Sequence, residues 1–75
     1  MTLDQLEKNK PMIVRSLARG SDFDGLTSKL MDMGLYPGKQ VTVVLKAPFG
    51  DPIAVDVDGY LLSLRKFEAS LVEVV

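Results

Sequence analysis

The apolar pattern of this chain changes from helical to strand-like within one short stretch, residues 30–39. Gly34 lies where a helix ends on a residue in the left-handed conformation. Pro37 and Gly38 suit the two central positions of a type II turn. Residues 40–46 are then rich in β-branched residues and alternate as a strand does. The stretch therefore predicts a helix end, a tight turn and a strand start, and few small folds contain that junction.

The helix before this junction is predicted over residues 22–33. Its N-cap would be Ser21 or Asp22, because both side chains accept hydrogen bonds from the first helical N–H groups. Leu35 would lie over Leu30 and close the C-terminal cap. The apolar side chains that we expect on its buried face are spaced by three or four residues: Phe23, Leu26, Leu30 and Met33.

Five segments have strand character, and two of them form a predicted hairpin. Asp58-Gly59 separates the alternating runs 53–57 and 60–65, and this dipeptide favours a type I′ turn. In the strand after the junction, Val41, Val43 and Leu45 are expected to share the buried face. The remaining strands are predicted at 12–17 and 71–75, with a single helical turn at 66–70 linking the hairpin to the last strand.

These elements predict a mainly β fold, a small SH3-like five-stranded barrel that covers residues 1–75 as a single domain. Curling into a barrel protects the edges of a sheet this short. The 22–33 helix would lie in the first long connection and cover one open end. A short N-terminal helix of one or two turns is also expected, because Thr2 and Gln5 form a capping box.

Composition narrows the function. The 75 residues contain no cysteine and no histidine, which removes thiolate metal sites, the commonest transition-metal ligand and the usual general base. A net charge of −1 with scattered basic residues argues against nucleic-acid binding. No apolar run approaches the roughly 20 residues that span a bilayer, and the N-terminus has no leader pattern. We therefore expect a cytoplasmic protein without an enzymatic activity, a cofactor or direct membrane insertion.

Three segments together resemble the ferrous iron transport protein A (FeoA) family. They are Leu-Met-Asp-Met-Gly-Leu-Tyr-Pro-Gly at 30–38, Gly-Asp-Pro-Ile at 50–53 and Leu-Arg-Lys-Phe-Glu-Ala at 64–69. The first segment alone is also similar to the small C-terminal barrel of metal-responsive repressors. The second and third segments favour the transport family.

The resemblance implies a cytoplasmic accessory protein of bacterial ferrous iron uptake, with no established enzymatic chemistry. Its partner would be the membrane ferrous iron transporter that carries a GTP-binding domain, and this partner would hold it at the inner membrane peripherally. Two alternatives stay open: a free-standing regulatory barrel that acts on a metal-dependent transcriptional repressor, and a weak ferrous iron carrier. Weak self-association stays open as well.

Candidate side chains for these roles are few. Asp51, Asp56 and Asp58 could offer oxygen ligands to Fe²⁺, but the turns and the strand around them explain all three locally, so no metal site is predicted. Exposed apolar, aromatic and basic residues could instead contact a protein partner. The predicted partner-binding residues are Met31, Leu35, Tyr36, Phe49, Leu61 and Arg65.

Overall fold

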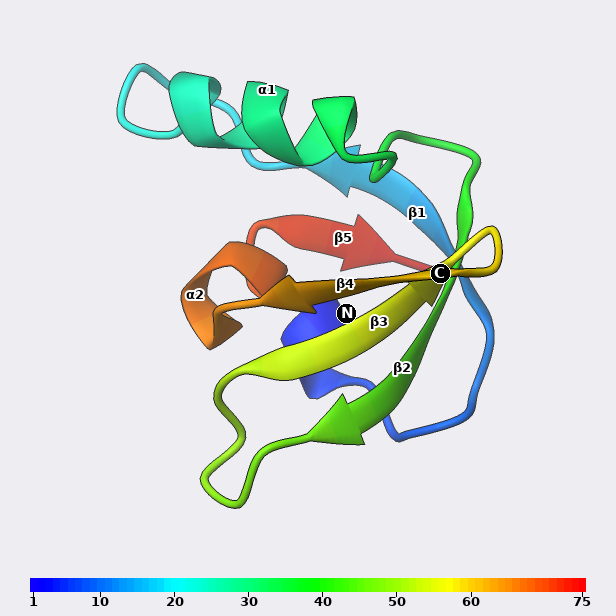
Figure 1. The fold of residues 1–75 in the computed structure, drawn as a ribbon. Helices are drawn as coiled ribbons and strands as arrows, with labels where there is room; N and C mark the ends of the chain where they lie inside the picture. The colour runs from blue at the N-terminus through cyan, green and yellow to red at the C-terminus, as the bar shows by residue number, and fades with distance from the viewer.

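Five antiparallel strands form one strongly curled sheet, and a helix runs along its open side (Figure 1). The computed structural model describes all of residues 1–75. The mainly β, SH3-like architecture predicted from the sequence is confirmed. In chain order the elements are a 3-10 turn (Leu3–Gln5), β1 (Met12–Leu17), α1 (Asp24–Asp32), β2 (Gln40–Lys46), β3 (Ile53–Val57), β4 (Tyr60–Leu64), α2 (Lys66–Ala69) and β5 (Val72–Val74).

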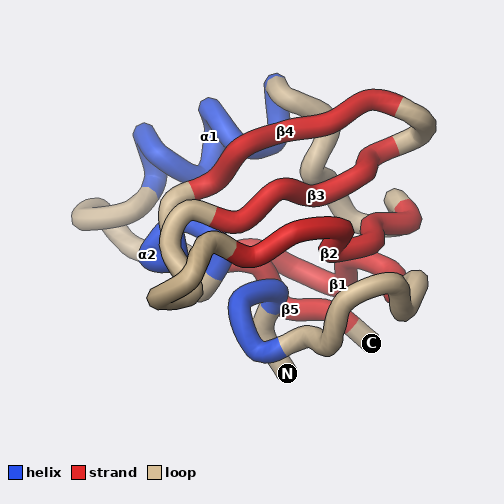
Figure 2. Tube along the Cα trace, turned by 60° about the horizontal axis from the view of Figure 1, so that its bottom comes forward, coloured by secondary structure: helices blue, strands red, loops and turns tan.

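The strands lie in the order β4-β3-β2-β1-β5, so β4 and β5 are the two edges and do not pair with each other. Figure 2 shows the strands in this order, from β4 at the top to β5 below. The 3-10 turn packs against α2 and β5 and closes one end. The inner face is filled by one apolar cluster, to which every strand, both helices and the 3-10 turn contribute. Its fully buried large members are Leu3, Leu6, Val14, Leu30, Leu35, Val41, Val43, Ile53, Val55, Val57, Leu64 and Val72.

The junction between α1 and β2 has the geometry that the sequence predicts. Gly34 has φ 104°, and its N–H bonds to Met31 O at 2.9 Å, while Leu35 N–H bonds to Leu30 O at 3.1 Å. This pair of bonds is the Schellman motif. The turn that follows is closed by Lys39 N–H to Tyr36 O at 3.1 Å. It then joins the sheet, because Val14 of β1 exchanges two backbone bonds with residues 38 and 39.

The start of α1 differs from the prediction. The helix begins at Asp24, and neither Ser21 nor Asp22 caps it; Phe23 occupies the N-cap position without a side-chain bond. The Asp24 carboxylate instead accepts a hydrogen bond from Gly20 N–H at 3.2 Å, which fastens the preceding turn to the helix. Of the predicted apolar face only Leu30 is fully buried. Thr27 is also buried, so the helix faces the barrel a little differently than the apolar spacing indicated.

Leu45 was expected in the core, and this prediction is wrong: 59% of its surface is exposed. The pairing between β2 and β3 shifts register between Val43 and Leu45, so Val43 pairs with Val55 and Leu45 pairs with Ala54. A bulge of one residue moves all later side chains to the opposite face of a strand. Leu45 therefore points outward, although it lies two residues after a buried valine.

Three short turns are close to expectation. The N-terminal helix is a single 3-10 turn, and Thr2 N–H bonds to the Gln5 side chain at 2.9 Å, as in the predicted capping box. The hairpin between β3 and β4 has positive φ at both Asp58 and Gly59, as a type I′ turn requires. The predicted turn after β4 is α2, which is four residues long.

Candidate functional site

The predicted partner-binding residues lie at several places on the molecule. Leu61 and Arg65 are exposed on and just after β4, and 64% of the Leu61 surface is accessible. Phe49 stands alone at the tip of the β2–β3 loop and is 95% exposed. Met31 on α1 and Tyr36 in the junction are about two-fifths exposed, at 40% and 44%. The structure therefore places Leu61 on β4 and Arg65 directly after it. Arg65 is also near the loop that carries Phe49, because the neighbouring Lys66 N–H bonds to Asp51 at 3.0 Å.

Leu35 does not belong with these residues. Its side chain is completely buried, because the Schellman motif folds it back over Leu30 into the core. The same motif that makes Leu35 recognisable in the sequence also removes it from the surface. It can stabilise the junction but cannot contact a partner in this conformation.

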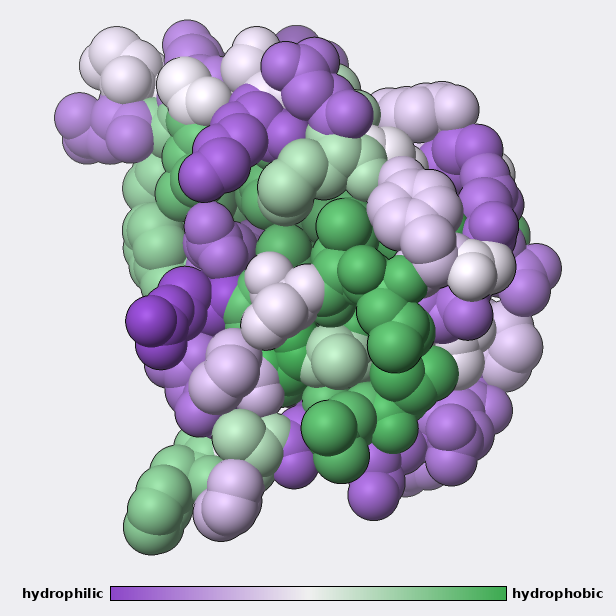
Figure 3. Space-filling view, viewed as in Figure 1, coloured by the Kyte–Doolittle hydropathy of each residue, from purple (hydrophilic) through white to green (hydrophobic).

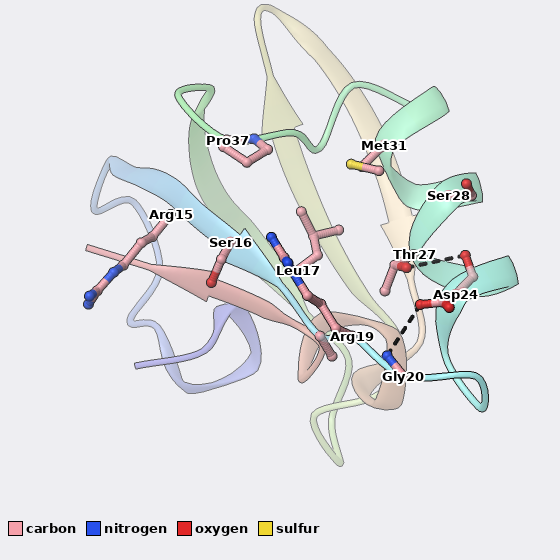
Figure 4. A pocket seen from close by; sticks show the side chains of 11 residues that line it. Arg15, Ser16, Leu17, Arg19, Gly20, Asp24, Thr27, Ser28, Met31 and Pro37 are labelled. Carbon is pink, nitrogen blue, oxygen red and sulfur yellow. Dashed lines mark hydrogen bonds between the residues drawn. The ribbon is translucent and has the colours of Figure 1, made fainter.

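One open groove of about 530 Å³ lies between β1 and α1. Figure 4 shows Leu17 and Arg19 projecting into the space between strand and helix, with Met31 and Pro37 at one end, whereas Arg15 points away. Thr27 lies on the helix side and donates a hydrogen bond to Asp24 O at 3.3 Å. The groove is mixed in polarity and contains no assembled set of catalytic groups.

A second groove of about 550 Å³ lies between α1 and the outer edge of β4. Lys29 and Met33 line it from the helix, and Ser63 and Arg65 line it from β4 and its end. Pro52 and Glu68 complete the lining. Three of these residues were not predicted as site residues, because nothing in the spacing of α1 and β4 indicates that the two elements come together: Lys29, Met33 and Ser63.

The outer face of the β2–β3–β4 sheet carries an apolar patch. Leu45 and Ala54 are opposite one another, and Leu61 is on the next strand, across from Asp56. In Figure 3 hydrophobic atoms gather over β3 and β4, bordered by hydrophilic residues. We define the outer patch as Leu45, Ala54 and Leu61. An exposed apolar cluster of this kind, rimmed by polar residues, is typical of an interaction surface.

Electrostatic contacts hold the hairpin against the junction. The Lys39 ammonium group bonds to the Asp58 carboxylate and lies 5.1 Å from the centre of the Tyr36 ring. The hydrogen bond to Asp58, with a smaller contribution from Tyr36, raises the pKa of Lys39 above its usual value. The Tyr60 hydroxyl donates to Met33 O at 2.5 Å and links β4 to the end of α1. These contacts are structural, since none of them leaves a reactive group free.

The three aspartates do not form a cluster. Asp51 accepts a hydrogen bond from Lys66 N–H at 3.0 Å, Asp56 accepts one from Gly59 N–H at 3.0 Å, and Asp58 pairs with Lys39. No group of three or more potential metal-ligating side chains comes together in the structure. No helix is long and apolar enough to cross a membrane.

A curled five-stranded antiparallel sheet with one helix across its open side defines a small SH3-like barrel. The family model of the FeoA domain matches residues 1–75, and the chain belongs to the FeoA family.

Two relatives illustrate this membership. An Fe(2+) transport protein A/Fe(2+) transporter FeoB fusion protein of Porphyromonas gingivalis is 35% identical over 75 residues, which is 99% of this chain and 8% of the fusion protein. The chain thus spans a small part of that relative. The crystal structure of Stenotrophomonas maltophilia FeoA complexed with zinc, described as a prokaryotic SH3 domain protein, matches with a TM-score of 0.87 and 32% identity. This match covers 100% of this chain and 89% of the other.

A manganese-dependent transcriptional repressor has a similar fold. Its TM-score is 0.76 at 20% identity, over 96% of this chain and 39% of the repressor. At this identity the likeness concerns the fold alone. The similarity to repressor barrels that the junction suggested is therefore a similarity of architecture.

Proposed function

We propose that this chain is an accessory protein of ferrous iron uptake that binds the cytoplasmic, GTP-binding part of the membrane ferrous iron transporter and modulates transport or GTP turnover. The observation that carries the proposal is the fusion relative, in which a segment similar to nearly the whole chain is joined to a FeoB transporter. Joining two interacting proteins raises their effective concentration, and natural fusions are consistent with such a partnership.

The surface of the barrel supports a binding role. Large apolar side chains such as Leu61, Leu45 and Phe49 are exposed, and rigid or adaptable apolar groups of this kind anchor protein interfaces. The chain has no histidine or cysteine, and Asp51, Asp56 and Asp58 are engaged in local hydrogen bonds or an ion pair. A non-enzymatic, cytoplasmic role is part of the same proposal.

The two alternatives receive less support. A ferrous iron carrier needs oxygen ligands that converge, whereas Asp51, Asp56 and Asp58 bond to different neighbours. Action on a metal-dependent repressor is motivated only by a shared fold, which carries no information about partners.

Binding to the purified full-length transporter in detergent tests the proposal. We expect association at micromolar concentrations that changes between GDP and a non-hydrolysable GTP analogue. Leu61→Gln should weaken it, whereas Lys8→Gln, in the exposed segment before β1, should not. Absence of binding with and without nucleotide would contradict the proposal, and saturable Fe²⁺ binding to the isolated chain in an anaerobic titration would favour the carrier instead.

A further inference from the structure

The two edges of the sheet differ in which segments cover them. The β5 edge is covered by the chain's own N-terminus: Val74 N–H bonds to Met1 O at 2.8 Å, Thr2 forms a bridge with Glu73, and the terminal ammonium bonds to the Glu73 carboxylate at 3.0 Å. No strand or chain terminus covers the β4 edge, since β3 is its only neighbour in the sheet, and α1 flanks this edge across a groove of about 550 Å³. Unpaired edges invite further strands, and most proteins protect them.

The hairpin geometry identifies the backbone groups that are free at this edge. A two-residue loop makes Val57 and Tyr60 a hydrogen-bonded pair, and the alternation of an antiparallel ladder then assigns the next bonded pairs to Leu62 and Leu64. The N–H and C=O groups of Leu61 and Ser63 therefore point away from β3. Neither residue makes a backbone hydrogen bond elsewhere in a loop or turn.

The five residues of β4 contain no feature that opposes edge pairing. The register of β4 with β3 is continuous over all five pairs, whereas the β1–β5 and β2–β3 ladders both contain a shift. The strand contains no proline and no lysine. A regular strand of this kind that faces an open groove can accept another extended segment.

The side chains beside this edge indicate the chemistry of that segment. Leu61 joins the outer patch at one end of β4, and at the other end Arg65 and Lys29 face the groove that we described between β4 and α1. Neither cation is in an ion pair. The one acidic group there, Glu68, accepts a hydrogen bond from Arg65 N–H at 2.8 Å. The edge is thus apolar at one end and has unpaired positive charge at the other.

We infer that the free edge of β4 binds an extended segment of a protein partner by β-strand addition, with an acidic residue beside Arg65 and Lys29 and an apolar residue beside Leu61. Because Leu61 and Arg65 are four residues apart on one face, the partner's acidic and apolar residues must also be four positions apart. The backbone groups of Leu61 and Ser63 supply affinity, and the two ends of the strand supply specificity. The inference gives the mode of docking and rests on the proposed function only for the identity of the partner.

A peptide titration tests the inference without the transporter. The probe is acetyl-Thr-Glu-Thr-Val-Thr-Val-Thr-amide, added to the ¹⁵N-labelled chain and followed by NMR. At saturation we expect the largest shifts at Leu61 and Ser63, and their amide exchange should slow by about tenfold or more because the edge groups become bonded. A peptide with lysine in place of glutamate should bind at least about tenfold more weakly.

Two variants define the site. Ser63→Pro removes an edge N–H group without removing a hydrogen bond to β3. The variant should therefore keep the NMR spectrum of the folded chain but no longer bind the peptide. Arg65→Glu should weaken binding of the acidic peptide and strengthen binding of the lysine peptide. Lys8→Glu, a charge reversal in the exposed segment before β1, should change neither affinity. If Ser63→Pro disturbs the fold, N-methylation of the peptide at alternate residues tests the same contact, because only one of the two patterns should abolish binding.

Shifts centred away from β4, no shifts at millimolar peptide, or equal binding of the two peptides would overturn the inference. Protection of Leu61 and Ser63 in the free chain that grows with protein concentration would also overturn it, since the occupant would be a second copy. The transporter assay separates the two proposals. If the transporter binds Ser63→Pro as well as it binds the wild type, the inference fails and the function stands. If the peptide binds the edge but the transporter does not bind the chain, the inference stands and the proposed function fails.

Discussion

Replacing Gly34 by alanine tests the junction between α1 and β2 most directly. Gly34 has φ 104°, a region that an L side chain rarely adopts. A Cβ atom there would also collide with the Tyr60 hydroxyl, which donates to Met33 O at 2.5 Å. The substitution therefore strains the backbone and displaces the group that links β4 to α1.

The expected loss in the free energy of unfolding is the sum of two contributions. The backbone strain is roughly 1–2 kcal/mol for a non-glycine residue in the left-handed region. Loss of the Tyr60 hydrogen bond adds about 0.5–1.5 kcal/mol. The sum, roughly 1.5–3.5 kcal/mol, is a large part of the free energy of unfolding expected for a domain of this size, roughly 4–11 kcal/mol.

Urea denaturation followed by circular dichroism measures these terms in a double-mutant cycle with Tyr60→Phe. The hydroxyl is absent in the Phe background, so Gly34→Ala should then destabilise only by the strain, and the two changes should couple by about 1 kcal/mol. Gly38→Ala is the matched control. Gly38 has φ 97°, but a Cβ there meets no atom within 4 Å, so its effect should be the same in both backgrounds.

The reasoning is refuted if Gly34→Ala destabilises the wild type and the Tyr60→Phe variant equally. It is also refuted if Gly34→Ala is no worse than Gly38→Ala in the wild type. Either result would mean that contact with the Tyr60 hydroxyl contributes nothing to the requirement for glycine at this position.

Three further predictions concern stability. Gly25→Ala should stabilise the chain by up to about 1 kcal/mol in thermal or urea unfolding, because Gly25 is helical and an added Cβ meets no neighbour; destabilisation would contradict this. Leu45→Ala should lower the free energy of unfolding by less than about 1 kcal/mol and Val43→Ala by about 2 kcal/mol or more, because the bulge exposes Leu45 and leaves Val43 buried; equal effects would argue against the bulge. Because the folded state raises the pKa of Lys39 from 10.5, its contribution is complete below that pH and is lost as pH rises through the higher folded value. Urea unfolding of Lys39→Met should therefore show a shallower loss of stability above pH 10.5, and an unchanged alkaline profile would argue against the Lys39–Asp58 contact.

Several features of the fold could be predicted because they depend on neighbouring residues alone. The Schellman motif at Gly34, the type I′ turn at Asp58-Gly59 and the capping box at Thr2 each need particular residue types at fixed offsets. The strand segments also follow from short alternating patterns. Local steric and hydrogen-bonding preferences determine these elements before any long-range contact forms.

The start of α1 and the exposure of Leu45 could not be predicted in the same way. The Asp24 carboxylate accepts a hydrogen bond from Gly20 N–H, and the helix begins at Asp24, two residues after the predicted start. The bulge at Val44 is a property of the pairing between β2 and β3. Such a shift depends on both strands, so the sequence of β2 alone is compatible with either face for Leu45.

In the candidate site, too, some features could be predicted from local sequence and others depend on the folded chain. The exposure of Leu61 and Arg65 could be predicted because apolar and charged residues off the buried face stand out in a strand pattern, and their contact with a partner stays a prediction. Leu35 was wrongly expected at the surface, because its burial depends on Leu30 and the closed cap. Lys29 and Ser63 were missed because α1 and β4 meet only in the folded chain.

The sequence by itself determined the junction, the hairpin, the five strands and the family. Only the tertiary structure decided that the chain's N-terminus covers β5 while β4 stays open beside Lys29 and Arg65. The physical reason is that turns and caps are governed by interactions within a few residues. A free sheet edge, in contrast, is defined by which distant segments fail to pair with it.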